Sequence, residues 1–293
     1  MAAEAYRTFT WRSRDGLLLS GREYGARDLP GVPAVCLAGL TRNAADFDAL
    51  AHHLSGHARS PRRVVALDMR GRGASEHDPN PSNYDIAAET NDALDGMVAA
   101  GIDEAAIVGT SRGAILAMAM SAIRPGVLHA VVMNDLGPVI EPDGLVAIRA
   151  YLERMPVPKD WSSAVEAVRV AQRKSFPKLD DAGWERFARA IFTERDGRLA
   201  PAHDPAIRRT LDAVAEGSAP PPMWAAFDGL RNVPVLSVRG GLSKLFSART
   251  QDAMAERRPD MRVLVVPDQG HAPLLDDEPT MEAVADFLAE HDR

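Results

Sequence analysis

Ser111 stands in a sequence context that is typical of a serine nucleophile. Residues 109–113 read Gly-Thr-Ser-Arg-Gly, with a short apolar run before them and a run of good helix formers after them. A serine on such a sharp strand-to-helix turn exposes its hydroxyl, and N–H groups at the helix N-terminus can face a developing oxyanion. Ordinary glycine-serine turns share this pattern, so the nucleophile hypothesis requires a base nearby.

His271 is the histidine that the sequence places best for the role of that base. It lies between the strand predicted at 263–266 and the last predicted helix, at 280–290. Because the carboxyl ends of parallel strands meet at one edge of a sheet, we expect this loop beside the turn that carries Ser111. We therefore predict that His271 accepts the Ser111 proton, and we interpret the other histidines as solvated or capping side chains.

Two backbone N–H groups are expected to form an oxyanion hole next to Ser111. One belongs to Arg112, which directly follows the predicted nucleophile. The other belongs to Leu40, in the loop after the strand predicted at 34–38, where Gly39 permits a tight turn. A plain strand-to-helix turn could contain the same residues, so this prediction depends on Ser111 and His271.

Hydrophobic patterning predicts a doubly wound α/β sheet that positions these loops. Segments 7–13 and 17–24 alternate polar and apolar residues around a turn, which favours an antiparallel hairpin. Later apolar runs are typical of parallel strands covered on both faces, at 34–38, 64–67, 105–108, 130–133, 233–238 and 263–266. Helical patterns separate most of these runs, at 44–54, 86–99, 114–123, 248–256 and 280–290. This alternation indicates right-handed crossovers between parallel strands.

A long insertion interrupts the alternation between residues 133 and 233. It has no convincing strand, and amphipathic helical patterns occur at 145–154, 162–174, 181–192 and 207–216. We therefore expect a helical cap at 138–226 over the sheet edge, and a core formed by 1–137 and 227–293. Of the aromatic residues in the cap, Tyr151, Trp161 and Trp224 are predicted to bind substrate. Most such side chains are expected to form the cap's own core.

Five motifs fall in the predicted loops. They are Leu40-Thr41-Arg42-Asn43 with Ala45-Asp46-Phe47, Asp68-Met69-Arg70-Gly71-Arg72-Gly73-Ala74-Ser75, the turn at 109–113, Asn134-Asp135-Leu136-Gly137-Pro138, and Gly270-His271-Ala272-Pro273. With them the chain resembles bacterial serine hydrolases and esterases of the α/β-hydrolase fold over essentially its whole length. The resemblance implies a mostly parallel sheet of eight strands, a helical cap inserted after the sixth strand, and no cofactor. It also implies that the segment 68–75 is structural.

The chain departs from this family at the acid of the catalytic triad. The family's acid usually follows the seventh strand, in a stretch similar to Arg-Gly-x-x-Ser-Asp, and here Lys244 stands at the aspartate position. A lysine cannot accept the histidine N–H. Asp135 is the best substitute, because some members of the fold, including pancreatic-type lipases, take their acid from the end of the sixth strand. Two alternatives remain open: Asp135 only orders its loop, or a Ser-His pair works without an acid. Asp268 is expected to point away.

The side chain of Arg112 has two possible roles. A guanidinium beside the nucleophile can bind a substrate carboxylate, and we count Arg112 among the predicted substrate-binding residues on this basis. Alternatively, the side chain pairs with a carboxylate of the cap or a loop and serves the structure. Both roles remain open.

Composition limits the classes of partner. The 293 residues carry a net charge of −7, which argues against binding to nucleic acid or anionic membranes. The single cysteine, Cys36, lies in an apolar run and is expected to be buried. We see no signal peptide and no apolar run of membrane-spanning length, so we expect a cytoplasmic protein. A homodimer remains open.

These features favour a cofactor-free serine hydrolase that acts on a small carboxylic ester, a lactone or a related acyl compound. Ser111 attacks the carbonyl carbon, His271 transfers the proton, and Asp135 orients His271. One alternative is hydrolysis of a carbon–carbon bond in a β-diketone or a ring-cleavage product, which uses the same serine and histidine. The other is a catalytically impaired protein that binds a ligand on this scaffold, an alternative that Lys244 keeps open.

Overall fold

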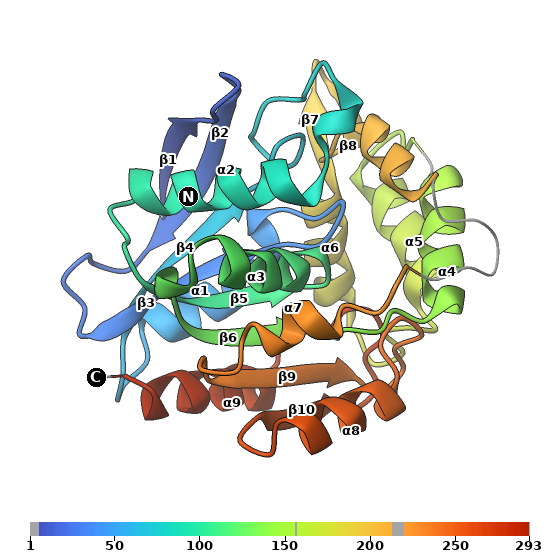
Figure 1. Cartoon of the computed structure of the whole chain (residues 1–293). Helices are drawn as coiled ribbons and strands as arrows, with labels where there is room; N and C mark the ends of the chain where they lie inside the picture. Colours follow the sequence, from blue (N-terminus) through green and yellow to red (C-terminus); the bar gives the residue numbers. More distant parts are fainter. Residues whose placement is uncertain (1–5, 156, 213–219, 293) are drawn as a thin grey trace.

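A mixed sheet of eight strands forms the centre of the molecule (Figure 1). The computed structural model describes residues 6–155, 157–212 and 220–292. The strands follow the order β1-β2-β4-β3-β5-β6-β9-β10. Their bounds are β1 Arg7–Arg12, β2 Leu18–Tyr24, β3 Gly31–Leu37, β4 Arg62–Asp68, β5 Ala105–Thr110, β6 Leu128–Asn134, β9 Val235–Gly240 and β10 Arg262–Val266. Only the β1–β2 and β2–β4 pairings within this sheet are antiparallel, which confirms the predicted fold.

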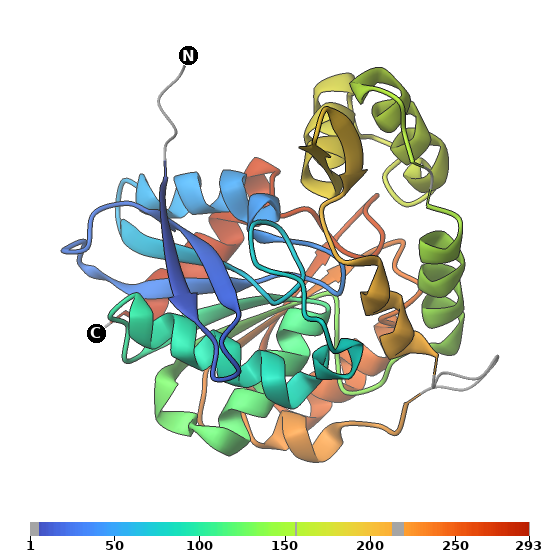
Figure 2. The same cartoon turned by 90° about the horizontal axis from the view of Figure 1, so that it is seen from above.

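Helices cover both faces of the sheet (Figure 2). The helices α1 (Asp48–Ser55) and α9 (Glu278–Glu290) pack on one face, while α2 (Ile86–Ala99), α3 (Arg112–Ile123) and α8 (Ala248–Arg257) pack on the other. Successive residues of a strand point to opposite faces, so Val35 and Leu37 join one core cluster and Cys36 joins the other. Cys36 is fully buried as expected, and burial raises the pKa of its thiol.

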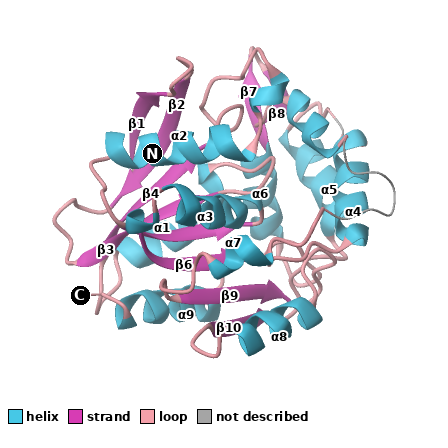
Figure 3. Ribbon diagram, in the orientation of Figure 1, coloured by secondary structure: helices cyan, strands magenta, loops and turns pink. Residues whose placement is uncertain are grey.

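The cap folds into helices and a small hairpin, as the cyan and magenta ribbons of Figure 3 show. Its elements are α4 Pro142–Glu153, α5 Trp161–Gln172, α6 Asp181–Ile191, β7 Phe192–Arg195, β8 Arg198–Pro201 and a 3₁₀ helix at Pro205–Leu211. Asp160 and Asp180 accept backbone N–H bonds at the starts of α5 and α6, which fixes where these helices begin. The expectation of no strand in the insertion was wrong, because β7 and β8 pair antiparallel.

The two ends of the insertion lie side by side at the rim of the core. The N–H of Met223 donates to the carbonyl of Pro138 at 2.7 Å. The next helix, α7 (Trp224–Asp228), packs against α3 of the core. The helix expected at 207–216 is a 3₁₀ turn as far as Leu211, and residues 213–216 lie outside the described residues. In the part of the chain that the structure describes, no helix is both long enough and apolar enough to cross a bilayer.

Candidate active site

Ser111 occupies the sharp turn between β5 and α3. Its φ angle of 52° is in the left-handed region, which is unfavourable for a side chain and is maintained by close packing around the turn. A Cβ atom at Gly113 would lie 2.0 Å from the Leu37 carbonyl oxygen, and one at Gly109 would lie 2.5 Å from the Gly113 backbone. Glycine is therefore required on both sides of Ser111, because larger residues would push the turn off the sheet.

Two short hydrogen bonds join Ser111 to His271 and His271 to Asp135. The Nε2 atom of His271 lies 2.8 Å from the Ser111 Oγ, and its Nδ1 atom lies 2.8 Å from the Asp135 Oδ2. Asp135 is fully buried at the end of β6, and its Oδ1 accepts the Gly240 N–H at 2.7 Å. The carboxylate is therefore fixed by a neighbouring strand and can hold one orientation of the imidazole ring.

The other acid positions lie away from His271. Lys244, which stands where the family's usual aspartate would be, is exposed to solvent after β9. Asp268 forms an ion pair at 2.6 Å with Lys178 of the cap, so it points away from His271 as expected. Among the described residues, Asp135 is the carboxylate that bonds to the ring.

The backbone of Leu40 approaches the nucleophile through the loop after β3. A Cβ atom at Gly39 would lie 3.6 Å from the Cβ of Ser111. The Leu40 carbonyl accepts a hydrogen bond from the Arg72 Nε at 2.8 Å, which fixes the peptide that follows Leu40. Within the described ranges, neither the Leu40 N–H nor the Arg112 N–H donates a hydrogen bond, so both are free to bind an oxyanion.

The side chain of Arg112 does not enter the cavity above Ser111. Its Nε donates to Glu89 of α2 at 2.6 Å, and its Nη2 donates to the Tyr84 carbonyl at 2.9 Å. Arg72 bonds to the other oxygen of the Glu89 carboxylate at 2.7 Å. Burial raises the pKa of Glu89, but the two guanidinium groups outweigh this effect and hold it below its usual value. The prediction that this side chain binds substrate is therefore corrected: it serves the structure.

The segment 68–75 is structural, as the resemblance implied. Asp68 accepts the N–H groups of Ala44 at 2.7 Å and Ala74 at 3.0 Å, and so connects two loops. Arg70 is buried and pairs with Asp78 at 2.7 Å and Asp92 at 2.6 Å. These bonds hold the loop after β4 against the rest of the core.

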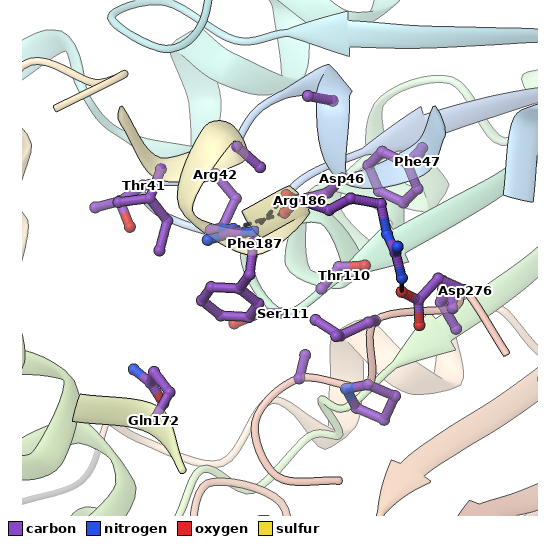
Figure 4. A pocket seen from close by; sticks show the side chains of 18 of the residues that line it. Thr41, Arg42, Asp46, Phe47, Thr110, Ser111, Gln172, Arg186, Phe187 and Asp276 are labelled. Atoms are coloured by element: carbon purple, nitrogen blue, oxygen red, sulfur yellow. Dashed lines mark hydrogen bonds and ion pairs between the residues drawn. The ribbon is translucent and has the colours of Figure 1, made fainter. Parts of the chain in front are cut away.

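A cavity of about 520 Å³ lies between Ser111 and the cap (Figure 4). Ser111, His271 and Leu40 line its base. The cap supplies mostly apolar side chains: Ile148, Tyr151, Leu152, Met155, Phe176 and Phe187. Tyr151 therefore lines the cavity as predicted, and burial raises the pKa of its phenol.

Trp161 and Trp224 are absent from the described cavity lining. Trp161 packs against the core of the cap, with the Arg189 guanidinium 4.5 Å from its ring centroid. Trp224 belongs to α7, where it packs against the core edge-on to Phe227. The prediction that these two residues bind substrate is corrected, because their partly buried rings pack against the cores of the cap and of the sheet instead.

The charged residues of the cavity were not predicted from the sequence. Arg42 pairs with Asp46 at 2.5 Å, and Arg186 of α6 pairs with Asp276 at 3.5 Å, as Figure 4 shows. The signal for Arg42 was its place in the motif that begins at Leu40, two residues beyond the predicted oxyanion donor. Arg186 had no such signal, because an arginine on an amphipathic helix usually faces solvent.

One group of described residues has metal-binding chemistry, but it lies outside this cavity. The ligand atoms of His53, His57 and Glu282 all lie within 4.8 Å of one another. Arg59 donates to the Glu282 carboxylate at 2.9 Å, and the Ser60 N–H donates to His57 Nδ1 at 3.3 Å. These bonds engage Glu282 and His57 beside the contact between α1 and α9, and the Nε2 of His53 lies 3.2 Å from the Glu282 carboxylate.

Known proteins share this architecture. The model of the alpha/beta hydrolase family matches residues 34–287. A 3-hydroxybutyrate-oligomer hydrolase from Cupriavidus necator is 29% identical, with 86% of each chain covered. A 2-(acetamidomethylene)succinate hydrolase from Mesorhizobium japonicum is also 29% identical, with 85% of each covered. The crystal structure of an alpha/beta hydrolase from Novosphingobium aromaticivorans superposes with a TM-score of 0.87 and 35% identity, covering 97% of this chain and 98% of that one.

Proposed function

This chain belongs to the alpha/beta hydrolase family, and from that premise we propose that it hydrolyses a small carboxylic ester or lactone through an acyl-enzyme on Ser111. The observation that supports this most strongly is the hydrogen-bonded series from Ser111 through His271 to Asp135, with both distances at 2.8 Å. A relative whose name states hydrolysis of 3-hydroxybutyrate oligomers supports an ester as the bond that is cleaved.

Proton transfer begins at His271. Its Nε2 takes the proton of the Ser111 hydroxyl while the oxygen attacks the carbonyl carbon. Asp135 accepts the Nδ1–H and stabilises the imidazolium that forms, because its carboxylate is buried and already held by the Gly240 N–H. His271 then donates the proton to the leaving alcohol, and a water molecule repeats the sequence to release the acid.

Charge that develops on the carbonyl oxygen would be stabilised by the N–H groups of Leu40 and Arg112. Both belong to backbone next to Ser111, and both lack an acceptor within the described residues. Donors that are already oriented need no rearrangement during the reaction, and one such donor typically contributes ~10²–10³ in turnover.

The test is turnover of p-nitrophenyl butyrate by the wild-type protein and by Ser111→Ala. We expect the substitution to remove the turnover above background, because it removes the nucleophile. Ser162→Ala is the matched control, since Ser162 is an exposed serine of α5, and it should retain the wild-type rate. Wild-type turnover in Ser111→Ala would contradict the proposal.

A further inference from the structure

The cavity above Ser111 has charged side chains beside its apolar lining: Arg22, Arg42, Arg186, Arg189, Asp46, Asp48 and Asp276. Three of the four arginines pair with the three aspartates, Arg22 with Asp48, Arg42 with Asp46 and Arg186 with Asp276. Arg189 pairs with Glu185 of its own helix. A paired guanidinium can still bind an anion where one of its N–H edges remains free. Such an edge points to an anionic group on the molecule that enters the cavity.

Arg42 is placed to meet such a group close to the nucleophile. A Cβ atom at Gly39 would lie 3.5 Å from the Cγ of Arg42 and 3.6 Å from the Cβ of Ser111, so both side chains border the same small space. The Arg42 guanidinium lies under the cap, 4.7 Å from the ring centroid of Phe187 (Figure 4). Burial raises the pKa of the Tyr151 phenol, and the positive charge of Arg42 opposes this rise.

One edge of the Arg42 guanidinium is open. Asp46 accepts from Nε at 2.7 Å and from Nη2 at 2.5 Å, and this bidentate pairing fixes the plane of the group. The Nη1 atom makes no hydrogen bond within the described residues and is not fully buried. A guanidinium has five N–H donors, so a second carboxylate can bind along the Nη1–Nη2 edge.

We propose that Arg42 binds a free carboxylate on the acyl part of the substrate, so that the compounds hydrolysed are esters of dicarboxylic acids that retain one ionised carboxyl group. This inference rests on the proposed function and narrows its substrate class. Binding of a substrate carboxylate, which the sequence suggested for Arg112, then belongs to Arg42. Asp46 orients the guanidinium, and the free Nη1–Nη2 edge receives the carboxylate of the substrate.

The experiment compares two p-nitrophenyl esters of similar length, the monoester of glutaric acid and the ester of hexanoic acid. The measured quantity is the ratio of kcat/KM for the glutarate ester to that for the hexanoate ester. We expect a ratio well above one for the wild-type protein and a fall of about tenfold or more in Arg42→Lys. A lysine can pair with Asp46 but has no second planar edge, and a charged hydrogen bond is worth about a factor of ten or more.

Two further variants make the result specific. Arg173→Met removes an exposed arginine of the cap outside the cavity and should leave the ratio unchanged. If thermal melting shows that Arg42→Lys is unfolded, the double variant Arg42→Gln/Asp46→Asn replaces the ion pair by a neutral pair and should also reduce the ratio. Equal ratios in the wild-type protein and a folded Arg42 variant would overturn the inference.

Glutarate binding separates this inference from the proposed function. Calorimetry should detect glutarate binding to wild-type protein, and weaker or no binding to Arg42→Lys. Binding that depends on Arg42, with no turnover of either ester, would contradict the hydrolase proposal but support the carboxylate site. Turnover of the hexanoate ester, with no preference for the glutarate ester and no glutarate binding, would overturn the carboxylate site alone.

Discussion

Two fully buried carboxylates support the turn at Ser111 through different partners. Asp135 bonds to the imidazole of His271 and to a backbone N–H. Glu89 bonds to two guanidinium groups, those of Arg72 and Arg112. The partner of Asp135 changes its protonation state during the proposed reaction, whereas the partners of Glu89 remain charged at all working pH values.

This difference assigns different tasks to the two carboxylates. In the proposed reaction Asp135 acts on the proton, because it holds the ring that would exchange a proton with Ser111. Glu89 acts on the geometry of the expected oxyanion hole. Its partner Arg72 also donates to the Leu40 carbonyl, and the backbone N–H of its partner Arg112 is the other expected oxyanion donor. One buried carboxylate thus connects the two backbone segments that would form the oxyanion hole. Loss of Asp135 should impair activity first, and loss of Glu89 should impair stability first.

Of the substitutions at the two carboxylates, Asp135→Asn should have the larger effect on activity. We expect turnover to fall by about 10⁴-fold, since an amide in place of the triad acid stabilises the wrong tautomer of the histidine. The melting temperature should change little by comparison, and steady-state kinetics with circular dichroism measures both. Undiminished turnover in Asp135→Asn would remove Asp135 from the catalytic group.

Glu89→Gln should have the largest effect on stability. Replacing one member of a buried ion-pair group leaves charge without compensation and typically costs about 3–5 kcal/mol in the free energy of unfolding. Urea denaturation measures this loss. Asp95→Asn on the same helix is the matched control and should change stability little, because its pair with Arg14 is exposed. A loss of unfolding free energy in Glu89→Gln as small as that in Asp95→Asn would contradict the structural role of Glu89.

His203 of the cap is a third buried titratable side chain to compare with Asp135 and Glu89. Its backbone pairs with that of Arg72, and burial together with the Arg72 charge lowers the pKa of the ring to about 4. Below the unfolded pKa, ~6.5, the unfolded chain binds a proton that the folded protein excludes. Stability is therefore complete above this pH and falls as the pH drops toward 4.

Between pH 7 and pH 5, this single ring should reduce the free energy of unfolding by about 2 kcal/mol. Urea denaturation at the two pH values measures the change. His203→Gln removes the titrating group and should show a smaller difference between them. An equal pH dependence in both proteins would contradict the expected contribution of His203.

Lys244→Asp should have the smallest effect. It restores the acid at the family's usual position, but the structure already provides a bonded carboxylate at Asp135. We expect kcat/KM for p-nitrophenyl butyrate to stay close to the wild-type value. A marked increase in rate would show that Asp135 orients His271 poorly in solution.

The residues that follow strands could be predicted from the sequence. Ser111, Asp135 and His271 come after β5, β6 and β10, and the ends of parallel strands must meet at one edge. A residue that follows one of these strands therefore lies at this edge, close to the residues that follow the others. The same reasoning located Leu40 after β3.

Residues on helices and in the cap could not be predicted in this way. Arg112 turns toward Glu89, which is 23 positions earlier in the chain and gave no local signal. Trp161 and Trp224 pack against clusters of buried side chains that only the folded cap and core bring together. The strands β7 and β8 have four residues each, too few for a clear alternation of polar and apolar side chains.

Activation of Ser111 by His271 and Asp135 is tested most directly by the rate at which a fluorophosphonate labels the protein. The reagent forms a covalent bond with an activated serine, and mass spectrometry of the digested protein locates it. We predict a single adduct on Ser111 that forms about 10⁴-fold more slowly in Asp135→Asn and at the wild-type rate in Lys244→Asp. An adduct on another residue, or equally fast labelling in Asp135→Asn, would contradict the claim that Asp135 and His271 activate Ser111.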